Sequence, residues 1–228
     1  MSTVSLALAL LASAATPAAA QDPLNLGVLE NEDIQVVQKR LYAKEGRMEM
    51  AAAVGVLPFD AYTIAPKLQI SVGKHLSELV AWEVQLGGGY GLPTSTWRDL
   101  TGPVYGVVPE AYRYLASLTA GIQYAPVYAK MTWGSGRVFH HDVYFPVVAG
   151  VTTEQIVEED LVGEGGSPLA FAPTLGAGLG IRVFLPSGRH VRIEVRDDFL
   201  LQSRASGAKA LKQNVGITVG LGFLRQDS

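Results

Sequence analysis

Hydrophobic residues alternate with small or polar residues along most of this chain after residue 46. The segment 214–223 shows the pattern most completely, with Val, Ile, Val, Leu and Phe at every second position and Asn, Gly, Thr, Gly and Gly between them. Successive side chains of a β-strand point to opposite faces, so this segment predicts a strand with one apolar and one small or polar face. Eight segments alternate in this way: 47–56, 67–73, 80–87, 113–123, 142–153, 170–185, 191–196 and 214–223.

The segments between these strands differ in length. Residues 91–110, 154–168 and 203–210 are rich in Gly, Pro, Ser or Glu, which predicts long loops. Residues 75–78 and 186–188 predict short turns. Bacterial membrane barrels have short periplasmic turns and longer external loops, so this asymmetry indicates two distinct ends.

One connection, 126–141, is ambiguous because 128–133 could form a ninth strand. If the N-terminus is periplasmic, the long loops all lie outside only when 126–141 is a periplasmic connection. The count is then eight, and single-chain bacterial barrels have even strand numbers. We expect 125–130 to continue the fourth strand, with a short helix or turn beyond it.

The charged residues of the strands share a face with many glycines. A soluble lipocalin-like barrel would turn its apolar face inward and has no reason to place glycine on its solvent face. An eight-stranded membrane barrel does, because its lumen is just wide enough for side chains. The fold class is therefore an all-β, eight-stranded antiparallel up-and-down transmembrane β-barrel. The residues predicted to form a lumen-facing charged network are Arg47, Glu49, Lys67, Glu83, Arg113, Arg182, Arg192, Glu194 and Arg196.

The N-terminus has an apolar stretch followed by small residues at Ala18 and Ala20, which suit a signal-peptidase site before Gln21. We predict a cleaved signal peptide at 1–20, a periplasmic segment at 21–45, the barrel at 46–224 and a C-terminal tail at 225–228. Both termini of the mature chain are expected in the periplasm of a Gram-negative bacterium.

Composition narrows the function classes. The chain is 48% hydrophobic and 17% charged, yet its body contains no apolar run long enough for a membrane-spanning helix. A net charge of −3 without a basic stripe argues against nucleic-acid binding. The absence of cysteine removes disulfides, thiol catalysis and thiolate metal sites.

The last strand resembles the assembly signal of outer-membrane barrels, in which a polar residue, a glycine and two hydrophobic residues follow a fixed spacing. The residues that fit are Asn214, Gly216, Val219 and Leu221, with Phe223 as the near-terminal aromatic. We expect this strand to be recognised by the barrel-assembly machinery and to close the barrel.

No segment predicts a catalytic, cofactor or metal site. His140 and His141 are expected to form a loop pair beside Asp142, because neighbouring residues of an extended segment point to opposite faces. His75 and His190 fall at predicted periplasmic turns. No nucleophile elbow is present. The row Arg192, Glu194 and Arg196 is either a salt-bridge plug or the lining of a narrow ion path.

Four short motifs resemble the outer-membrane β-barrel domain family of myxobacteria and related deltaproteobacteria, small barrels of the OmpA/OmpX type. They are 32–40 (EDIQVVQKR), 125–130 (APVYAK), 142–144 (DVY) and 194–197 (EVRD). The resemblance implies a small outer-membrane barrel without catalytic residues, and some similar proteins belong to envelope or gliding-motility assemblies.

We therefore expect a non-enzymatic outer-membrane barrel with a plugged polar lumen, acting as a structural or interaction component of the envelope. Its expected partners are outer-membrane lipid and lipopolysaccharide, the barrel-assembly machinery and other envelope proteins. The alternatives are a narrow channel or small-solute transporter, and a lipid-modifying outer-membrane enzyme.

Overall fold

The computed structural model describes residues 42–134, 136–157, 168–204 and 207–226. All of them belong to the second of two compact units, Arg40–Ser228. The predicted signal peptide, most of the predicted periplasmic segment and the motif at 32–40 lie outside the described residues. No helix in this described part is long and apolar enough to cross a membrane.

The described residues form eight long strands, one two-residue strand, one short α-helix and one 3₁₀ turn. The bounds are β1 Arg47–Leu57, β2 Thr63–His75, β3 Val80–Gly89, β4 Leu92–Pro93, α2 Ser95–Thr101, β5 Ala111–Trp133, β6 Arg137–Val157, β7 Leu169–Phe184, η2 Pro186–Gly188, β8 Arg189–Ser203 and β9 Lys209–Gln226.

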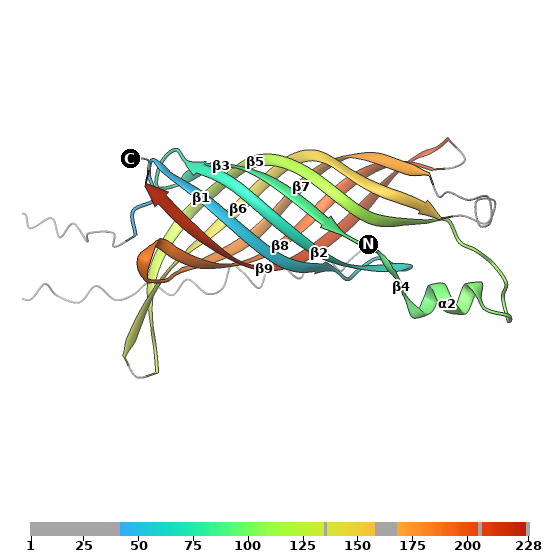
Figure 1. Cartoon of the computed structure of the whole chain (residues 1–228), viewed down its shortest axis with the longest axis horizontal. Coiled ribbons are helices and arrows are strands. Elements are labelled where there is room, and N and C mark those ends of the chain that lie inside the picture. Colours follow the sequence, from blue (N-terminus) through green and yellow to red (C-terminus); the bar gives the residue numbers. More distant parts are fainter. Residues whose placement is uncertain (1–41, 135, 158–167, 205–206, 227–228) are drawn as a thin grey trace, which may run out of the picture. The chain divides into compact units, whose positions relative to one another are not determined.

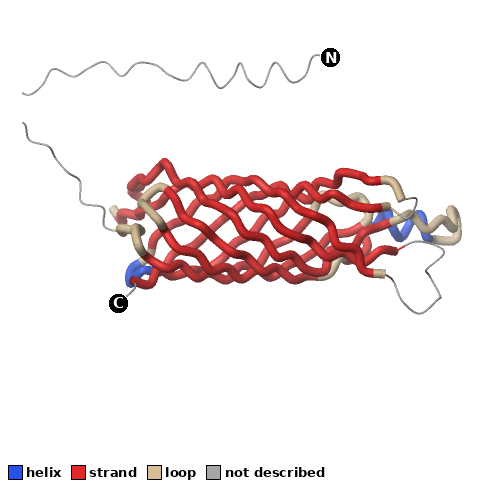
Figure 2. Tube along the Cα trace, turned by 90° about the horizontal axis from the view of Figure 1, so that it is seen from above, coloured by secondary structure: helices blue, strands red, loops and turns tan. Residues whose placement is uncertain are grey.

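The long strands close into a ring. Neighbouring strands pair antiparallel in chain order, and β1 pairs with both β2 and β9, which joins the first strand to the last. Figures 1 and 2 show the resulting barrel, with its strands tilted against its long axis. The short strand β4 pairs only with the start of β2. The predicted eight-stranded antiparallel barrel is confirmed, and Tyr128 to Trp133 form the end of β5 rather than an additional strand.

The barrel is apolar outside and polar inside. Leu68 and Leu221 are each 66% exposed on the outer face, whereas Arg182 and Glu154 are completely buried inside. A contiguous apolar surface around a polar interior suits lipid rather than water as the surrounding medium. The barrel is therefore of the transmembrane type.

A β-bulge near the start of β5 corrects one predicted face. The pairing of β5 with β6 shifts register between Tyr114 and Ala116, so one extra residue is inserted there. Such an insertion moves every residue before it to the opposite face. Tyr114 is consequently buried in the lumen, and Arg113, which the uniform alternation placed in the lumen, is not.

The connection after the fourth predicted strand is a long hairpin. Residues 125–130 do continue the strand: β5 runs to Trp133, Gly134 and Gly136 belong to the expected turn, and β6 starts at Arg137. The two strands pair continuously from Val127↔Val143 to Trp133↔Arg137. His140 and His141 therefore lie within β6, and the expected loop pair is wrong because the ladder extends past them.

The long loop predicted at 91–110 contains β4 and helix α2, which lies beyond one end of the barrel in Figure 1. Thr94 caps this helix by accepting a hydrogen bond from the Trp97 amide at 3.3 Å. The strands β1, β3, β6 and β8 all end at this same end of the barrel.

Candidate functional site: the charged lumen

Arg192 of β8 is the centre of the lumen. Its guanidinium donates hydrogen bonds to Glu83 of β3, to Glu49 Oε1 of β1 at 3.2 Å and to Glu194 Oε2 at 3.1 Å. Its Nε also donates to the Tyr144 hydroxyl at 3.2 Å. One side chain thus joins three carboxylates from three strands across the barrel, and we call the whole set of linked groups the charged lumen network.

Glu49 is the matching anionic centre. Its Oε1 lies 3.0 Å from His190 Nε2, and its Oε2 lies 2.7 Å from His75 Nε2 and 3.0 Å from Arg182 Nη2. Together with Arg192, four nitrogen-bearing side chains surround this one carboxylate. His75 is the last residue of β2 and His190 the second residue of β8, so both lie next to the predicted turns, and both are buried.

The network continues toward the end of the barrel where the described chain begins. Asp142 Oδ2 accepts hydrogen bonds from Arg182 Nη1 at 3.0 Å and from Lys44 Nζ at 2.6 Å. Asp142 and Arg182 are completely buried, and Lys44 is 1% exposed. The Tyr42 ring stacks on Phe184 at 5.3 Å between centroids. Tyr42 and Lys44, which precede β1 in the chain, therefore close this end of the lumen.

Toward the opposite end, Arg196 extends the network along β8. Its Nε donates to Asp198 Oδ1 at 2.9 Å, and its Nη1 lies 3.4 Å from Glu194 Oε1 and donates to Gln85. Lys67 is buried in the same part of the lumen. Buried charges are stable only when they are paired and hydrogen-bonded, and these pairs fill the interior. The geometry provides a lumen that is cross-linked by buried ion pairs and hydrogen bonds between strands.

The tyrosine at the centre of the network requires a glycine opposite it. Tyr144 donates to Glu194 Oε2 at 2.9 Å, and the guanidiniums of Arg182 and Arg192 lie 4.9 and 5.2 Å from its ring centroid. Its ring packs directly over Gly180, where an added Cβ would overlap the ring carbons. The glycine thus makes room for the aromatic ring in a narrow lumen.

We expect Gly180→Ala to lower the free energy of unfolding by about 1–3 kcal/mol, because the methyl group overpacks the lumen and displaces Tyr144. Gly88→Ala is the matched control, since a Cβ there meets nothing within 4 Å. Urea titration in detergent micelles, followed by tryptophan fluorescence, measures both. Equal stability of the two variants would contradict the role assigned to Gly180.

Seven of the nine residues predicted for the network are buried in the lumen: Glu49, Lys67, Glu83, Arg182, Arg192, Glu194 and Arg196. Arg113 instead donates to the Tyr90 hydroxyl at 3.3 Å, and its guanidinium lies 5.9 Å from the Trp97 ring centroid, as the bulge in β5 dictates. Arg47 is half-buried at the first position of β1 and joins no ion pair with another described residue.

Several network members were not anticipated. Asp142, Tyr144 and Asp198 share the inward phase of their strands, so strict alternation would have found them. His190 also alternates inward at the start of β8, where a turn was predicted. Lys44 precedes the first strand, and no periodic pattern marks it.

The residues of the predicted assembly signal lie in β9, the strand that closes the ring. Asn214 and Gly216 face the lumen, whereas Val219, Leu221 and Phe223 are 47%, 66% and 45% exposed on the outer face. Recognition of this strand during assembly stays a prediction. Within the described residues, no group of three or more His, Cys, Asp or Glu side chains is arranged to hold a metal ion.

At the long-loop end, Lys212 of β9 anchors the loop between β1 and β2. Lys212 Nζ lies 2.7 Å from Asp60 Oδ2. Burial alone would raise the pKa of Asp60, but the Lys212 ammonium and the amides of Tyr62 and Thr63 hold it below its usual value. A lowered pKa stabilises the fold above the carboxyl's unfolded pKa, and that stability is lost as the pH falls through the folded pKa.

We therefore expect wild type to be more stable than Asp60→Asn by a constant margin above about pH 5, and this margin to shrink below about pH 4. Denaturant titrations of both proteins between pH 3 and 7 measure the margin, and the other carboxylates cancel in the difference. A margin that persists undiminished at pH 3 would contradict the ionised pair.

Comparison with known proteins finds no matching family model and no matching curated sequence. Among solved structures, the chain is similar to the N-terminal β-barrel domain of Pseudomonas aeruginosa OprF, with 13% identity, a TM-score of 0.45 and coverage of 79% of this chain and 98% of that one. Neisserial surface protein A (NspA) gives 9% identity, a TM-score of 0.45 and coverages of 78% and 95%. A major outer membrane protein from Thermus thermophilus gives 12% identity, a TM-score of 0.38 and coverages of 78% and 99%.

At these identities the likeness concerns the fold alone. The closed ring, the apolar outer face and the polar lumen carry the assignment by themselves. The chain is an eight-stranded outer-membrane-type β-barrel.

Proposed function

We propose that this protein is a non-enzymatic barrel of the Gram-negative outer membrane with a closed lumen, acting as a structural or interaction component of the cell envelope. The observation that carries the proposal is the charged lumen network. Arg192 of β8 pairs with Glu83 of β3 on the opposite side of the ring, Arg182 of β7 pairs with Glu49 of β1, and Lys44 closes one end. Such a barrel presents its loops and ends to partners and does not conduct.

A planar lipid bilayer separates this proposal from the channel alternative. The purified full-length mature protein should show no unitary conductance steps under conditions in which a general porin does. Insertion is verified by the heat-modifiable migration of protein recovered from the bilayer lipid. Steady voltage-independent steps from correctly folded protein would favour the narrow channel instead.

The enzyme alternative predicts a chemical change in lipid. We expect the mass profile of lipopolysaccharide from a deletion strain to match that of the parent strain. A missing acyl or phosphate modification that returns on complementation would reject the non-enzymatic role.

The proposed orientation places the long connections outside and both termini in the periplasm. Its support is that the turns at 76–79 and 185–188 are short, whereas the connections at the opposite end are longer. The chain has no cysteine, so a single introduced cysteine is the only thiol of the protein that a maleimide can label. Val104→Cys should react with an impermeant maleimide on intact cells, and Leu76→Cys should not; both positions are well exposed.

We also propose kinship with the myxobacterial barrel family. Three of the four motifs lie in the described residues, and they contact one another. Motif 125–130 pairs with motif 142–144 through Val127↔Val143 and Tyr128↔Asp142. Tyr144 donates a hydrogen bond to Glu194 of motif 194–197. Family members should therefore keep Tyr144 and Glu194 together, and an alignment in which these two residues vary independently would contradict the kinship. Lipopolysaccharide, the barrel-assembly machinery and envelope proteins remain the proposed partners, and co-purification after mild detergent extraction tests the last.

A further inference from the structure

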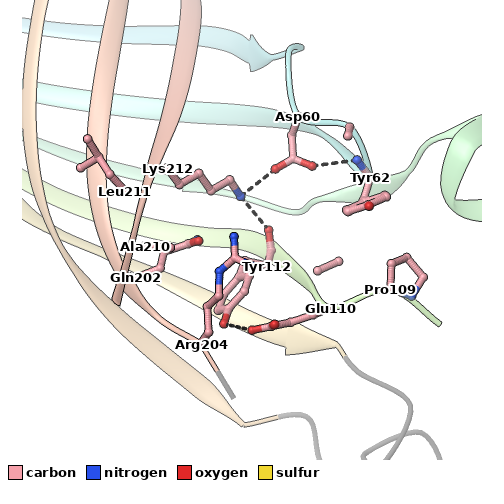
Figure 3. Close-up of a pocket in the computed structure, with 12 residues that line it drawn as sticks. Asp60, Tyr62, Pro109, Glu110, Tyr112, Gln202, Arg204, Ala210, Leu211 and Lys212 are labelled. Atoms are coloured by element: carbon pink, nitrogen blue, oxygen red, sulfur yellow. Dashed lines mark hydrogen bonds and ion pairs between the residues drawn. The ribbon is translucent and has the colours of Figure 1, made fainter. Parts of the chain in front are cut away.

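The long-loop end of the lumen is hollowed into a cup of about 430 Å³. We call it the outer vestibule; the polar residues that line it include Asp60, Glu110, Tyr112, Gln202, Arg204 and Lys212 (Figure 3). They come from the loop after β1, the segment entering β5, the end of β8 and the start of β9. The volume lies within the range of small-molecule sites, about 300–1,000 Å³.

The floor of the outer vestibule is closed by fixed polar groups. Lys212 Nζ lies 2.7 Å from Asp60 Oδ2 and 3.3 Å from Glu154 Oε1, and it donates to the Tyr112 carbonyl at 3.2 Å. Gln202 donates to the other oxygen of Glu154, whose side chain is completely buried. A ligand could therefore enter this cup from outside and could not pass through it.

The walls carry the groups that would select a ligand. An ammonium has three hydrogens, and Lys212 already contacts three acceptors, which leaves Arg204 as the cation of the vestibule suited to an incoming anion. Arg204 is exposed, and its guanidinium points into the cup in Figure 3. Glu110 accepts a hydrogen bond from the Tyr112 hydroxyl, which also donates to the carbonyl of Ser203 next to Arg204, and Asp60 lies on the opposite side of the cup.

This combination favours one chemical class. A guanidinium binds carboxylate in a bidentate, charge-assisted geometry. Carboxylates such as those of Glu110 and Asp60 accept hydrogen bonds from hydroxyls, and the rings of Tyr62 and Tyr112 offer apolar surface. A polyanion would meet Asp60 and Glu110 and be repelled, and a purely apolar ligand would leave the charges unpaired.

We propose that the outer vestibule binds an acidic sugar unit, with the sugar carboxylate on Arg204 and ring hydroxyls on Glu110 and Asp60. This site would give the proposed envelope component a ligand. The inference rests on the proposed outward orientation in one respect, which is that the ligand reaches the site from the cell exterior. Binding to purified protein does not depend on that orientation, so the two ideas fail separately.

The test is calorimetric titration of the full-length mature protein in detergent micelles with galacturonic acid, which carries one carboxylate. The uncharged methyl ester of the same sugar is the ligand control. Arg204→Gln should weaken binding at least about tenfold, the loss expected for one charge-assisted hydrogen bond. Lys209→Gln is the matched control, because it removes the same charge from the same hairpin but does not line the cup.

Heat-modifiable migration of each variant verifies that the barrel is folded. Tight binding of the acid, weak binding of the ester and a selective loss in Arg204→Gln support the site. No binding of the acid, equal binding of acid and ester, or equal losses in the two variants would overturn it. A parallel titration with lipopolysaccharide micelles tests the source of the sugar. Binding of lipopolysaccharide would indicate that the sugar is linked to a lipid, whereas binding of the free sugar acid alone would indicate a soluble sugar.

Discussion

Arg192→Met is expected to lower the free energy of unfolding by about 3–5 kcal/mol, the loss typical of removing one partner from a buried ion cluster. Methionine fills most of the space but leaves Glu83 and Glu194 without their principal cation. Glu49 retains Arg182 and the two histidines, so the damage should centre on the β3 side of the lumen. The carboxylates left unpaired must be protonated or hydrated inside a narrow barrel.

Urea titration in detergent micelles, followed by tryptophan fluorescence and gel migration, measures this loss. Arg189→Met is the matched control: it changes the same residue type in the same strand, but Arg189 is exposed, so its loss should stay within about 0.5 kcal/mol. A double variant, Arg192→Met with Glu83→Gln, should recover part of the stability, because one unpaired charge is removed with its partner. If Arg192→Met were as stable as Arg189→Met, the network would not hold the barrel together.

Asp142→Asn is expected to lower the free energy of unfolding by a similar amount, about 3 kcal/mol or more. The substitution keeps the shape but removes the negative charge that Lys44 and Arg182 share at 2.6 and 3.0 Å. Among the described residues, only Arg182 of these two cations pairs with another carboxylate, Glu49, so Lys44 is the group that loses its ion pair and should leave the lumen. Stability and closure of this end should therefore fall together.

Limited trypsin digestion provides a second measurement for this variant. Lys44 is 1% exposed in the folded protein, so cleavage after it should be slow in wild type and fast in Asp142→Asn. Asp99→Asn, an exposed change on α2, serves as the control for general loosening. Slow cleavage after Lys44 in the destabilised variant would show that the segment is held by something other than Asp142.

Alternation along the chain was sufficient to predict the barrel, because lipid outside and a packed polar lumen impose opposite demands on neighbouring residues. It also placed Arg192, Glu194 and Arg196 on the inner face, since β8 is regular throughout. The prediction failed where this regularity failed. One inserted residue in β5 exchanged the faces on which Arg113 and Tyr114 lie. The hydrophobic pattern of so few residues does not reveal such a bulge.

Contacts made by residues outside the strands could not be predicted from the sequence for a different reason. Lys44 finds Asp142 across 98 residues of chain, and only the folded ring brings the two together. The outer vestibule is built likewise from four separated segments, so its shape follows from loop geometry rather than from any local pattern.

The way the network is distributed among the strands has a consequence for how the chain matures. Arg192 on the next-to-last strand needs Glu49 on the first and Glu83 on the third, and β9 must pair with β1 before these groups are enclosed. A half-inserted sheet would expose the same charges without partners, so partly assembled forms should be poorly populated. Closure and neutralisation of the interior become a single cooperative event, and a point substitution in the lumen should slow biogenesis as well as weaken the finished barrel.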